Sequence, residues 1–317
     1  IFLSKISDNI TDKYDTLLKN CLEGVEKKLP RNIFSSDKTI VILSTTKGDI
    51  ERSLVGTIET SAKKIQKEFS LKHFPVVVSN GCVSGIIAIN VGANLIRAKN
   101  YDNAIVVGCD VISDFVLFGF QSLFAISDVP CMPFDKNRKG ITFGEGCAAV
   151  VLSKNNLIPG NFSIEYLEGT SSNDANHISG PSRTGEGLVR TVKKTLAIAG
   201  AEEKEIDFIS AHGTGTIFND DMESVAFNQL GMSHIPLNSL KGYFGHTQGA
   251  AGVIETAICL QMIKNNLLIK SLGFQNHGTT KQLNLITENR KQKIRTVLKT
   301  ASGFGGCNAS LLLKSAV

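Results

Sequence analysis

Residues 75–85 read Pro75-Val76-Val77-Val78-Ser79-Asn80-Gly81-Cys82-Val83-Ser84-Gly85. The apolar run predicts a buried strand at 76–79, and the small residues after the cysteine predict a helix over 83–99. Cys82 therefore stands at a strand-to-helix turn, where the helix dipole and free backbone N–H groups favour a thiolate. Taken alone, such a cysteine is also compatible with an inert buried filler.

Two loops further along the chain decide between these alternatives. They read Ala211-His212-Gly213-Thr214-Gly215-Thr216 and Lys241-Gly242-Tyr243-Phe244-Gly245-His246-Thr247. A thiol combined with histidines from separate loops is typical of enzymes that form covalent intermediates. The sequence therefore predicts an acyl-transfer enzyme with Cys82 as its nucleophile.

The segments around these motifs alternate between strand and helix patterns. Strand patterns occur at 39–44, 104–108, 207–210 and 236–240, and helix patterns occur at 1–38, 50–69 and 249–260. This alternation predicts an α/β fold with a buried sheet.

The two parts of the chain also echo each other. Phe143-Gly144-Glu145-Gly146-Cys147 and Phe304-Gly305-Gly306-Cys307 each precede an apolar run, although glycine-rich hairpins of this kind also arise by chance. Gly144 and Gly305 are 161 residues apart, and Cys82 and His246 are 164 residues apart. These nearly equal offsets predict a duplicated unit with halves at 1–155 and 156–317. The active site is then expected where the halves meet.

Bulk composition limits the functional classes. Of the 317 residues 42% are hydrophobic and 20% charged, and no apolar stretch approaches the roughly 18 residues of a transmembrane helix. The net charge of +5 comes from scattered basic residues, which argues against nucleic acid as a partner. The seven cysteines form no CxxC pair, so neither a metal site nor a disulfide framework is expected. Reduced thiols predict a cytoplasmic location.

Seven short motifs occur in one order between residues 72 and 315. They are Asn80-Gly81-Cys82-Val83-Ser84-Gly85, Pro133-Phe134-Asp135-Lys136-Asn137-Arg138, Gly144-Glu145-Gly146, the HGTGT run at 212–216, Asp220 with Glu223, the Lys241 to His246 step, and Gly303-Phe304-Gly305-Gly306. Together they resemble the β-ketoacyl-acyl-carrier-protein synthases, condensing enzymes of fatty-acid and polyketide synthesis. The resemblance implies a thiolase-like fold, in which two duplicated α/β halves form a layered α-β-α-β-α core. The pair of histidines resembles the synthase I/II and polyketide ketosynthase branch.

The resemblance implies a two-step chemistry. Cys82 would first accept an acyl group from a carrier protein, and the backbone N–H groups of Cys82 and Phe304 would form the oxyanion hole. Malonyl-carrier protein would then lose carbon dioxide while neutral His212 and His246 donate N–H groups to the enolate oxygen. Lys241, not acting as a base, would form with Glu255 a charged network that orients the histidines, the alternative being a simple structural ion pair.

The remaining site residues are also implied by the resemblance. Thr214, Thr216 and Ser179 would hydrogen-bond the phosphopantetheine arm, although threonine in a glycine-rich loop also fits ordinary turn chemistry. Asp220 and Glu223 would hold the His212 loop, or would be a charge pair at a helix start. Phe304 would act as a gate for the acyl chain.

No cofactor is expected beyond the phosphopantetheine of the carrier, and no metal. The implied partners are acyl-carrier protein and a second subunit, in a homodimer or in a heterodimer with a related chain. One alternative is a non-catalytic partner resembling a chain-length factor, whose relatives usually lack the cysteine. Another is a thiolase-like enzyme acting on coenzyme A esters, for which Cys307 after Gly305-Gly306 would be the residue to watch.

The sequence departs from the family pattern at several points. Cys82 comes early in the chain and the first residue is Ile1, so we expect a short N-terminal half or one of which part is absent. Met132 stands where an arginine is usual, Ile217 replaces a proline, and Cys307 replaces a threonine. These changes leave the catalytic set intact and affect the shape of the acyl pocket.

Overall fold

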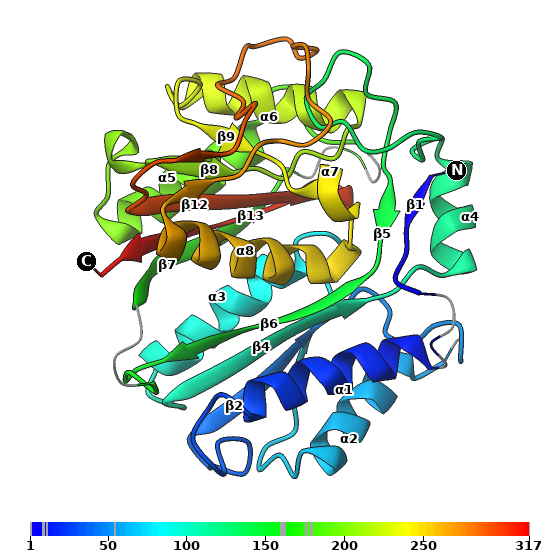
Figure 1. Cartoon of the computed structure of the whole chain (residues 1–317), viewed down its shortest axis with the longest axis vertical. Helices are drawn as coiled ribbons and strands as arrows, with labels where there is room; N and C mark the ends of the chain where they lie inside the picture. Colours follow the sequence, from blue (N-terminus) through cyan, green and yellow to red (C-terminus); the bar gives the residue numbers. More distant parts are fainter. Residues whose placement is uncertain are drawn as a thin grey trace.

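The structure is a computed structural model that describes residues 2–7, 10, 12–53, 55–158, 163–174, 177 and 180–316. Two sheets lie one above the other, with helices between them and on both outer sides (Figure 1). The first sheet has the order β3 (Val76–Val78), β2 (Thr39–Ser44), β4 (Asn103–Asp110) and β6 (Gly146–Ser153). The second has the order β7 (Ile164–Asn173), β13 (Cys307–Ser315), β12 (Thr296–Gly303), β8 (Phe208–Ser210) and β9 (Leu237–Asn238).

The two sheets share one topology. In the first, β2 runs parallel to β3 and β4, and β6 is antiparallel to β4. In the second, β8 runs parallel to β9 and β12, and β13 is antiparallel to β12. β7 adds a further antiparallel strand beside β13, and the described residues contain no counterpart beside β6. The predicted duplication and layered core are confirmed, whereas the boundary between residues 155 and 156, in the β6–β7 connection, stays a prediction.

The middle layer consists of α3 (Ser84–Arg97) and α8 (Ala251–Asn265), which contact each other and face both sheets. Their backbones touch at two glycines: a Cβ on Gly85 would lie 2.6 Å from the backbone nitrogen of Val253, and one on Gly252 would lie 2.6 Å from that of Ile86. Only residues without a side chain allow this approach. It brings the start of α3, and with it Cys82, next to the second half of the chain.

Helices form the outer layers. α1 (Lys13–Glu26) and α2 (Thr57–Glu68) cover the first sheet, and α5 (Glu186–Ala199) and α6 (Ile217–Gln229) cover the second (Figure 1). The helix expected over 50–69 begins only at Thr57, because Gly56 before it has a φ of 66° in the left-handed region.

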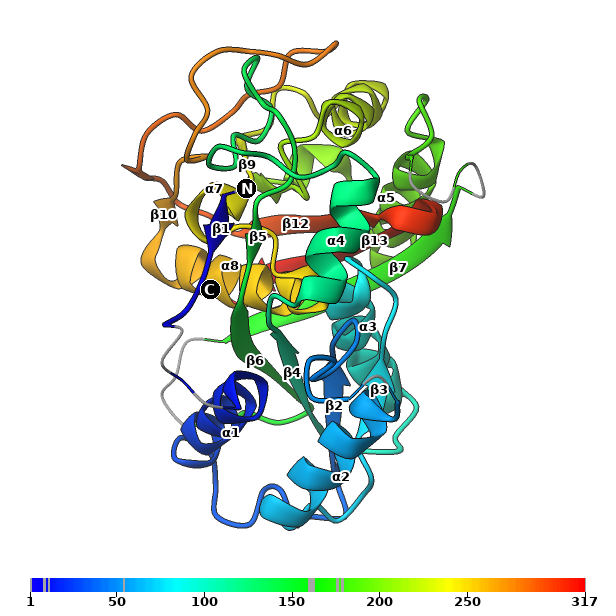
Figure 2. The same ribbon diagram turned by 90° about the vertical axis from the view of Figure 1, so that its right-hand side faces the viewer.

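The first residues also differ from the expectation of a helix-like segment over 1–38. β1 (Leu3–Ser4) pairs in parallel with β5 (Phe143–Gly144), and Figure 2 shows the two side by side. The remaining elements are α4 (Asp114–Ser122), α7 (Lys241–Phe244), β10 (Leu267–Leu268) and β11 (Arg290–Lys291). No helix in the described ranges has the length and apolar character needed to cross a membrane.

Candidate active site

Cys82 lies in the turn between β3 and α3, two residues before the helix begins. The turn is fixed by Ser84, whose hydroxyl accepts a hydrogen bond from the N–H of Asn80 (2.7 Å) and donates one to the carbonyl of Gly81 (2.6 Å). Gly303, at the end of β12, lies so close that a Cβ there would be 3.4 Å from that of Cys82. The nucleophile turn therefore contacts the loop that carries Phe304.

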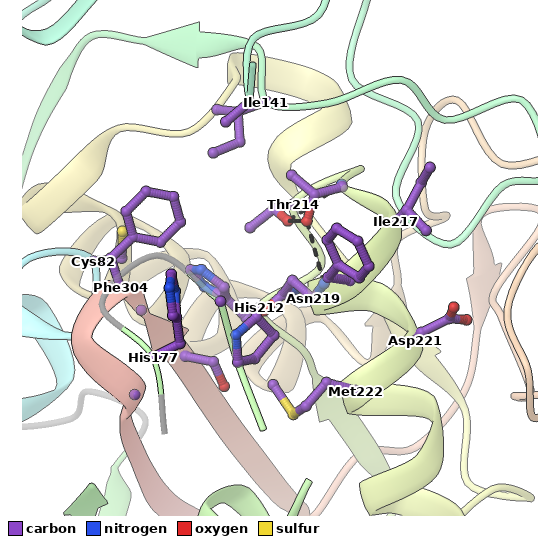
Figure 3. A pocket seen from close by; sticks show the side chains of 18 of the residues that line it. Cys82, Ile141, His177, His212, Thr214, Ile217, Asn219, Asp221, Met222 and Phe304 are labelled. Atoms are coloured by element: carbon purple, nitrogen blue, oxygen red, sulfur yellow. Dashed lines mark hydrogen bonds between the residues drawn. The ribbon is translucent and has the colours of Figure 1, made fainter. Parts of the chain in front are cut away.

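The three predicted catalytic side chains converge. The sulfur of Cys82 and one ring nitrogen each of His212 and His246 lie within 4.8 Å of one another. The two imidazole rings meet edge to face, with centroids 5.2 Å apart and planes at 83°. All three residues line a pocket of about 980 Å³, which Figure 3 shows with Cys82 and Phe304 opposite Met222. Residues from both halves of the chain thus share one cavity.

His212 is held from two directions. Its backbone N–H donates to Glu223 (2.8 Å), and the ammonium of Lys241 donates to its carbonyl oxygen (2.7 Å). The same ammonium lies 3.3 Å from Nδ1 of the ring. Because a lysine ammonium has only donors, Nδ1 must accept, and the proton of the neutral ring sits on Nε2.

His246 reaches the same tautomer by a different contact. Its Nδ1 accepts the backbone N–H of Gln248 (3.1 Å), so its Nε2 also carries the proton. That buried Nε2 has no hydrogen-bond partner among the described residues. The loop before it fits against Gly144, where a Cβ would lie only 1.7 Å from the carbonyl oxygen of Phe244. The Gly144-Glu145-Gly146 motif therefore seats the second histidine loop.

Both histidines are neutral at ordinary pH. Burial lowers the pKa of His212 and of His246 well below the usual value, and the nearby charge of Lys241 lowers each further. Cys82, His212 and His246 are spaced like metal ligands, but a metal needs the free lone pair of an imidazole nitrogen. With both Nδ1 atoms already accepting hydrogen bonds, the two Nε2–H groups are suited instead to donate to an oxygen.

The thiol of Cys82 differs from the expectation of a favoured thiolate. Burial raises its pKa to about 11, although the charges of Lys241 and Lys47 and a backbone hydrogen bond from Phe304 lower it in part. Desolvation of the anion thus outweighs the position at a helix start. Burial therefore favours the thiol over the thiolate.

The predicted Lys241–Glu255 network exists and has a third member. The Nζ of Lys241 lies 2.7 Å from Oε1 of Glu255, with both side chains fully buried. Lys299, on β12, lies 2.8 Å from Oε2 of the same carboxylate. Sequence reasoning missed Lys299, although a lysine within an apolar strand was the available signal, because buried lysines need a partner. No described hydrogen bond joins Lys241 to His246, so the network contacts His212 alone.

Asp220 and Glu223, both on α6, bind the backbone of the His212 loop. Glu223 accepts the N–H groups of His212 (2.8 Å) and Gly213 (2.6 Å). Asp220 accepts those of Thr214 (2.9 Å) and Gly215 (3.2 Å). They are therefore more than a charge pair at a helix start, and they fix the path of the loop.

The candidate pantetheine contacts are only partly described. Thr214 and Thr216 line the pocket, and their hydroxyls lie 2.9 Å apart. Thr216 is also the N-cap of α6, where its hydroxyl accepts the N–H of Asn219 (3.3 Å). The alternative structural role of this threonine is therefore present too. Ser179 lies outside the described residues.

Phe304 forms one wall of the pocket. Its side chain is 37% exposed and stacks on Phe120 of α4, with ring centroids 5.0 Å apart and planes at 22°. Figure 3 shows Phe304 beside Cys82. The ring is therefore a partly exposed part of the pocket lining, and its role as a gate stays a prediction.

Comparison with known proteins identifies relatives of this chain. Family models described as "Beta-ketoacyl synthase, N-terminal domain" and "Beta-ketoacyl synthase, C-terminal domain" match residues 35–157 and 166–275. A 3-oxoacyl-[acyl-carrier-protein] synthase 2 of Coxiella burnetii is 30% identical over 270 residues, which cover 81% of this chain and 65% of that relative. The ketoacyl synthase alpha subunit of the tetracenomycin polyketide synthase of Streptomyces glaucescens is 32% identical over 252 residues, covering 75% of this chain and 59% of that relative.

A solved structure extends the likeness to the whole chain. A ketosynthase from Xenorhabdus doucetiae, in complex with its chain length factor, matches with a TM-score of 0.82 at 26% identity, over 100% of this chain and 85% of that one. The two curated relatives are longer, since the chain spans 65% and 59% of their lengths.

Proposed function

Because this chain belongs to the β-ketoacyl synthase family and has its thiolase-like fold, we propose that it catalyses a decarboxylative Claisen condensation. A Cys82-bound acyl group would be joined to malonyl-acyl-carrier protein, giving a β-ketoacyl-acyl-carrier protein. The observation that carries the proposal is the meeting of one sulfur and two histidines within 4.8 Å in a single pocket.

In the first step the sulfur of Cys82 attacks the carbonyl carbon of an acyl thioester. The carrier's thiol leaves and takes up the proton that the Cys82 thiol loses, so the acyl group changes sulfur without a net change of charge. The tetrahedral oxyanion needs donors at this point. The backbone N–H of Phe304, which follows Gly303 beside Cys82, is proposed as one donor, with the N–H of Cys82 as the other.

In the second step the malonyl thioester loses carbon dioxide. The electron pair of the broken carbon–carbon bond becomes an enolate, whose oxygen is proposed to accept the Nε2–H groups of His212 and His246. The enolate carbon attacks the acyl-Cys82 carbonyl, and the Cys82 thiolate leaves. Two fixed neutral donors on buried side chains stabilise the developing charge without having to reorganise.

Supporting roles are proposed for the other residues. Lys241 and Glu255 are proposed to hold the tautomer of His212, and Asp220 and Glu223 to hold its loop. Thr214 and Thr216 are proposed to contact the phosphopantetheine arm, with Ser179 as a further contact. No cofactor of its own is proposed for the chain, because the carrier supplies that arm.

Acyl-carrier protein is the proposed partner in solution, together with a second subunit, either a copy of this chain or a related one. The Xenorhabdus doucetiae ketosynthase of similar structure is described in complex with its chain length factor, which supports the heterodimer as one form. A cytoplasmic location is proposed because all seven cysteines are free. The halves 1–155 and 156–317 are proposed as the two duplicated units.

Intact-mass analysis after incubation with acyl-acyl-carrier protein tests the function. We expect the wild type to gain one acyl group and Cys82→Ala to gain none. Failure of the wild type to form an adduct with any carrier-bound acyl group would contradict the enzyme. That result would favour the alternative of a non-catalytic partner resembling a chain-length factor.

A further inference from the structure

Lys299 is a fully buried lysine that the mechanism above does not use. It lies on β12 with 0% of its side chain exposed, and its ammonium is 2.8 Å from Oε2 of Glu255. Since Lys241 occupies Oε1 of the same carboxylate, two ammonium groups share one anion. This trio leaves one positive charge without a counter-charge inside the trio, and burial makes such a charge costly. Because an uncompensated buried charge lowers stability, Lys299 is expected to have a functional role, which its remaining contacts indicate.

The other contacts of Lys299 lead to the histidine loop. Its ammonium donates to the carbonyl oxygens of Ser210 (3.2 Å) and Ala211 (3.3 Å), the two residues directly before His212, and to that of Thr300 (2.7 Å). Lys241 donates to the carbonyl of His212 itself (2.7 Å). The two lysines therefore bind three successive carbonyls that end β8 and begin the histidine loop, and Glu255 joins them from α8.

We propose that Lys299 is a positioning residue for the decarboxylation step: its ion pair with Glu255 and its hydrogen bonds to the carbonyls before His212 hold the carboxylate and the loop in place, so that Lys241 stays on Nδ1 of His212 and the proton of that ring stays on Nε2. The inference rests on the proposed function only for its kinetic consequence. Its structural consequence, one fixed tautomer of His212, holds for any reaction at this site. Without Lys299, Lys241 is free to bind both oxygens of Glu255 and to leave the ring.

Charge supports the same role. The positive charges of Lys241 and Lys299 both lower the pKa of His212, after the larger effect of burial. Among the described residues, the charged and titratable groups around this ring include Cys82 before α3, Asp220 and Glu223 on α6, Lys241 on α7, His246 after α7, Glu255 on α8 and Lys299 on β12. Asp174, His177 and Arg183 line the same pocket. Loss of the Lys299 charge leaves Glu255 balanced by Lys241 alone. The pKa of His212 therefore rises, and its ring takes up a proton at higher pH.

A simpler role for Lys299 is to neutralise Glu255 for stability alone. The two roles differ in what they predict for the ring. A purely structural lysine would affect the folding free energy and all reaction steps together, whereas a positioning lysine alters the His212 tautomer and the decarboxylation step selectively.

The test compares wild type, Lys299→Met and Lys299→Gln, with Thr300→Val as the matched control. Thr300 is the next residue on the same strand, is buried, and has a hydroxyl without a described partner, so its replacement leaves the trio of charges intact. Lys299→Gln keeps a donor for the strand carbonyls and removes the charge. Nitrogen-15 NMR of labelled histidine, recorded in a Cys82→Ala background, reports the tautomer and the titration of His212.

In both Lys299 variants we expect the His212 midpoint to move to higher pH, and part of the neutral ring to carry its proton on Nδ1 instead of Nε2. The rate of malonyl-carrier-protein decarboxylation should fall about tenfold, and the acidic side of its pH–rate profile should move to higher pH. Acylation of Cys82 should change less than threefold, and Thr300→Val should match the wild type. An unchanged tautomer and midpoint, or equal loss in both steps, would overturn the proposal.

The two levels of inference fail separately. If the wild type neither acylates nor decarboxylates, the proposed function is wrong, while the NMR titration still decides the role of Lys299. If the wild type is active and the variants keep its pH profile and its ratio of the two rates, the function stands and Lys299 is only a structural residue.

Discussion

The ammonium of Lys241 lies 3.3 Å from Nδ1 of His212, and this one contact fixes which ring nitrogen carries the proton and can donate a hydrogen bond. The backbone N–H of Gln248 does the same for the adjacent ring of His246. Two unrelated donors thus set the same tautomer on two rings. The pocket consequently offers two N–H groups next to the Cys82 sulfur.

Replacing either histidine should slow decarboxylation selectively. His212→Ala and His246→Ala each remove one donor to the enolate oxygen, and we expect a loss of roughly 10²–10³-fold, as for one oxyanion-hole donor. Release of carbon dioxide from malonyl-carrier protein measures the effect, and the exposed His234→Ala provides the control. Retained decarboxylation in the double variant would exclude the assignment.

The reactivity of Cys82 should depend steeply on pH. Because burial raises its pKa to about 11, the thiolate is scarce at neutral pH, and the rate of alkylation should rise about tenfold per unit between pH 7 and 10. Lys241→Met removes a charge that lowers this pKa and should slow alkylation at each pH. Peptide mass analysis after iodoacetamide treatment checks both points. A rate that levels off near pH 8 would show a thiolate at rest.

Phe304→Ala should open the pocket without removing the backbone donor. The side chain stacks on Phe120, and its loss exposes the sulfur to bulkier acyl groups, while the N–H at position 304 remains. We expect the rate of acylation by longer acyl chains to increase relative to the rate with short chains. Leu123→Ala, another exposed residue of the pocket lining, is the control. An unaltered acylation rate and an unaltered preference for chain length would contradict the role of Phe304 as a gate.

Gly85→Ala should be strongly destabilising. Its Cβ would meet the backbone of α8 at 2.6 Å, so α3 and α8 would have to separate, at an expected cost of about 3 kcal/mol or more in unfolding free energy. Gly24→Ala, within α1, meets nothing within 4 Å and should stabilise by roughly 0.5–1 kcal/mol. Chemical denaturation of both variants measures the difference. Equal stabilities would mean that the helices do not approach so closely.

Asp110 should make stability fall as pH rises from about 4 to 6. Burial raises its pKa to about 6 from an ordinary 3.8, so the folded state binds the proton more tightly than the unfolded chain. The stabilisation from this proton is complete below the pKa of the unfolded chain. It decreases by roughly 3 kcal/mol as pH rises through the pKa of the folded state. Asp110→Asn should lack this component, which urea denaturation across the pH range measures. Parallel curves for the two proteins would contradict the shift.

Much of the fold and of the site was predictable from local patterns. The strand at 39–44 occurs where its apolar run predicts, and Cys82 lies at a strand-to-helix turn because strand and helix propensities change within a few residues. The motifs around His212 and His246 predicted that both rings share a site with Cys82, and the structure brings the three side chains together. The start of α2 was misplaced, because a left-handed Gly56 ends a helix pattern that composition alone would continue.

Other features depended on contacts between distant residues. No spacing in the sequence shows that Gln248 sets the tautomer of His246, or that Lys299 shares Glu255 with Lys241. The rise in the pKa of Cys82 could not be predicted either. The helix start that favours a thiolate is visible in the local sequence, whereas the burial that opposes the thiolate depends on the tertiary structure.

The sequence by itself determined which chemical groups this protein has and that they belong to two repeated α/β units, because motifs and periodicities are properties of neighbouring residues. The tertiary structure alone decided their protonation. Depth of burial, the partner of each ring nitrogen and the balance of two lysines against one carboxylate arise only when the halves meet, and these set where each proton sits.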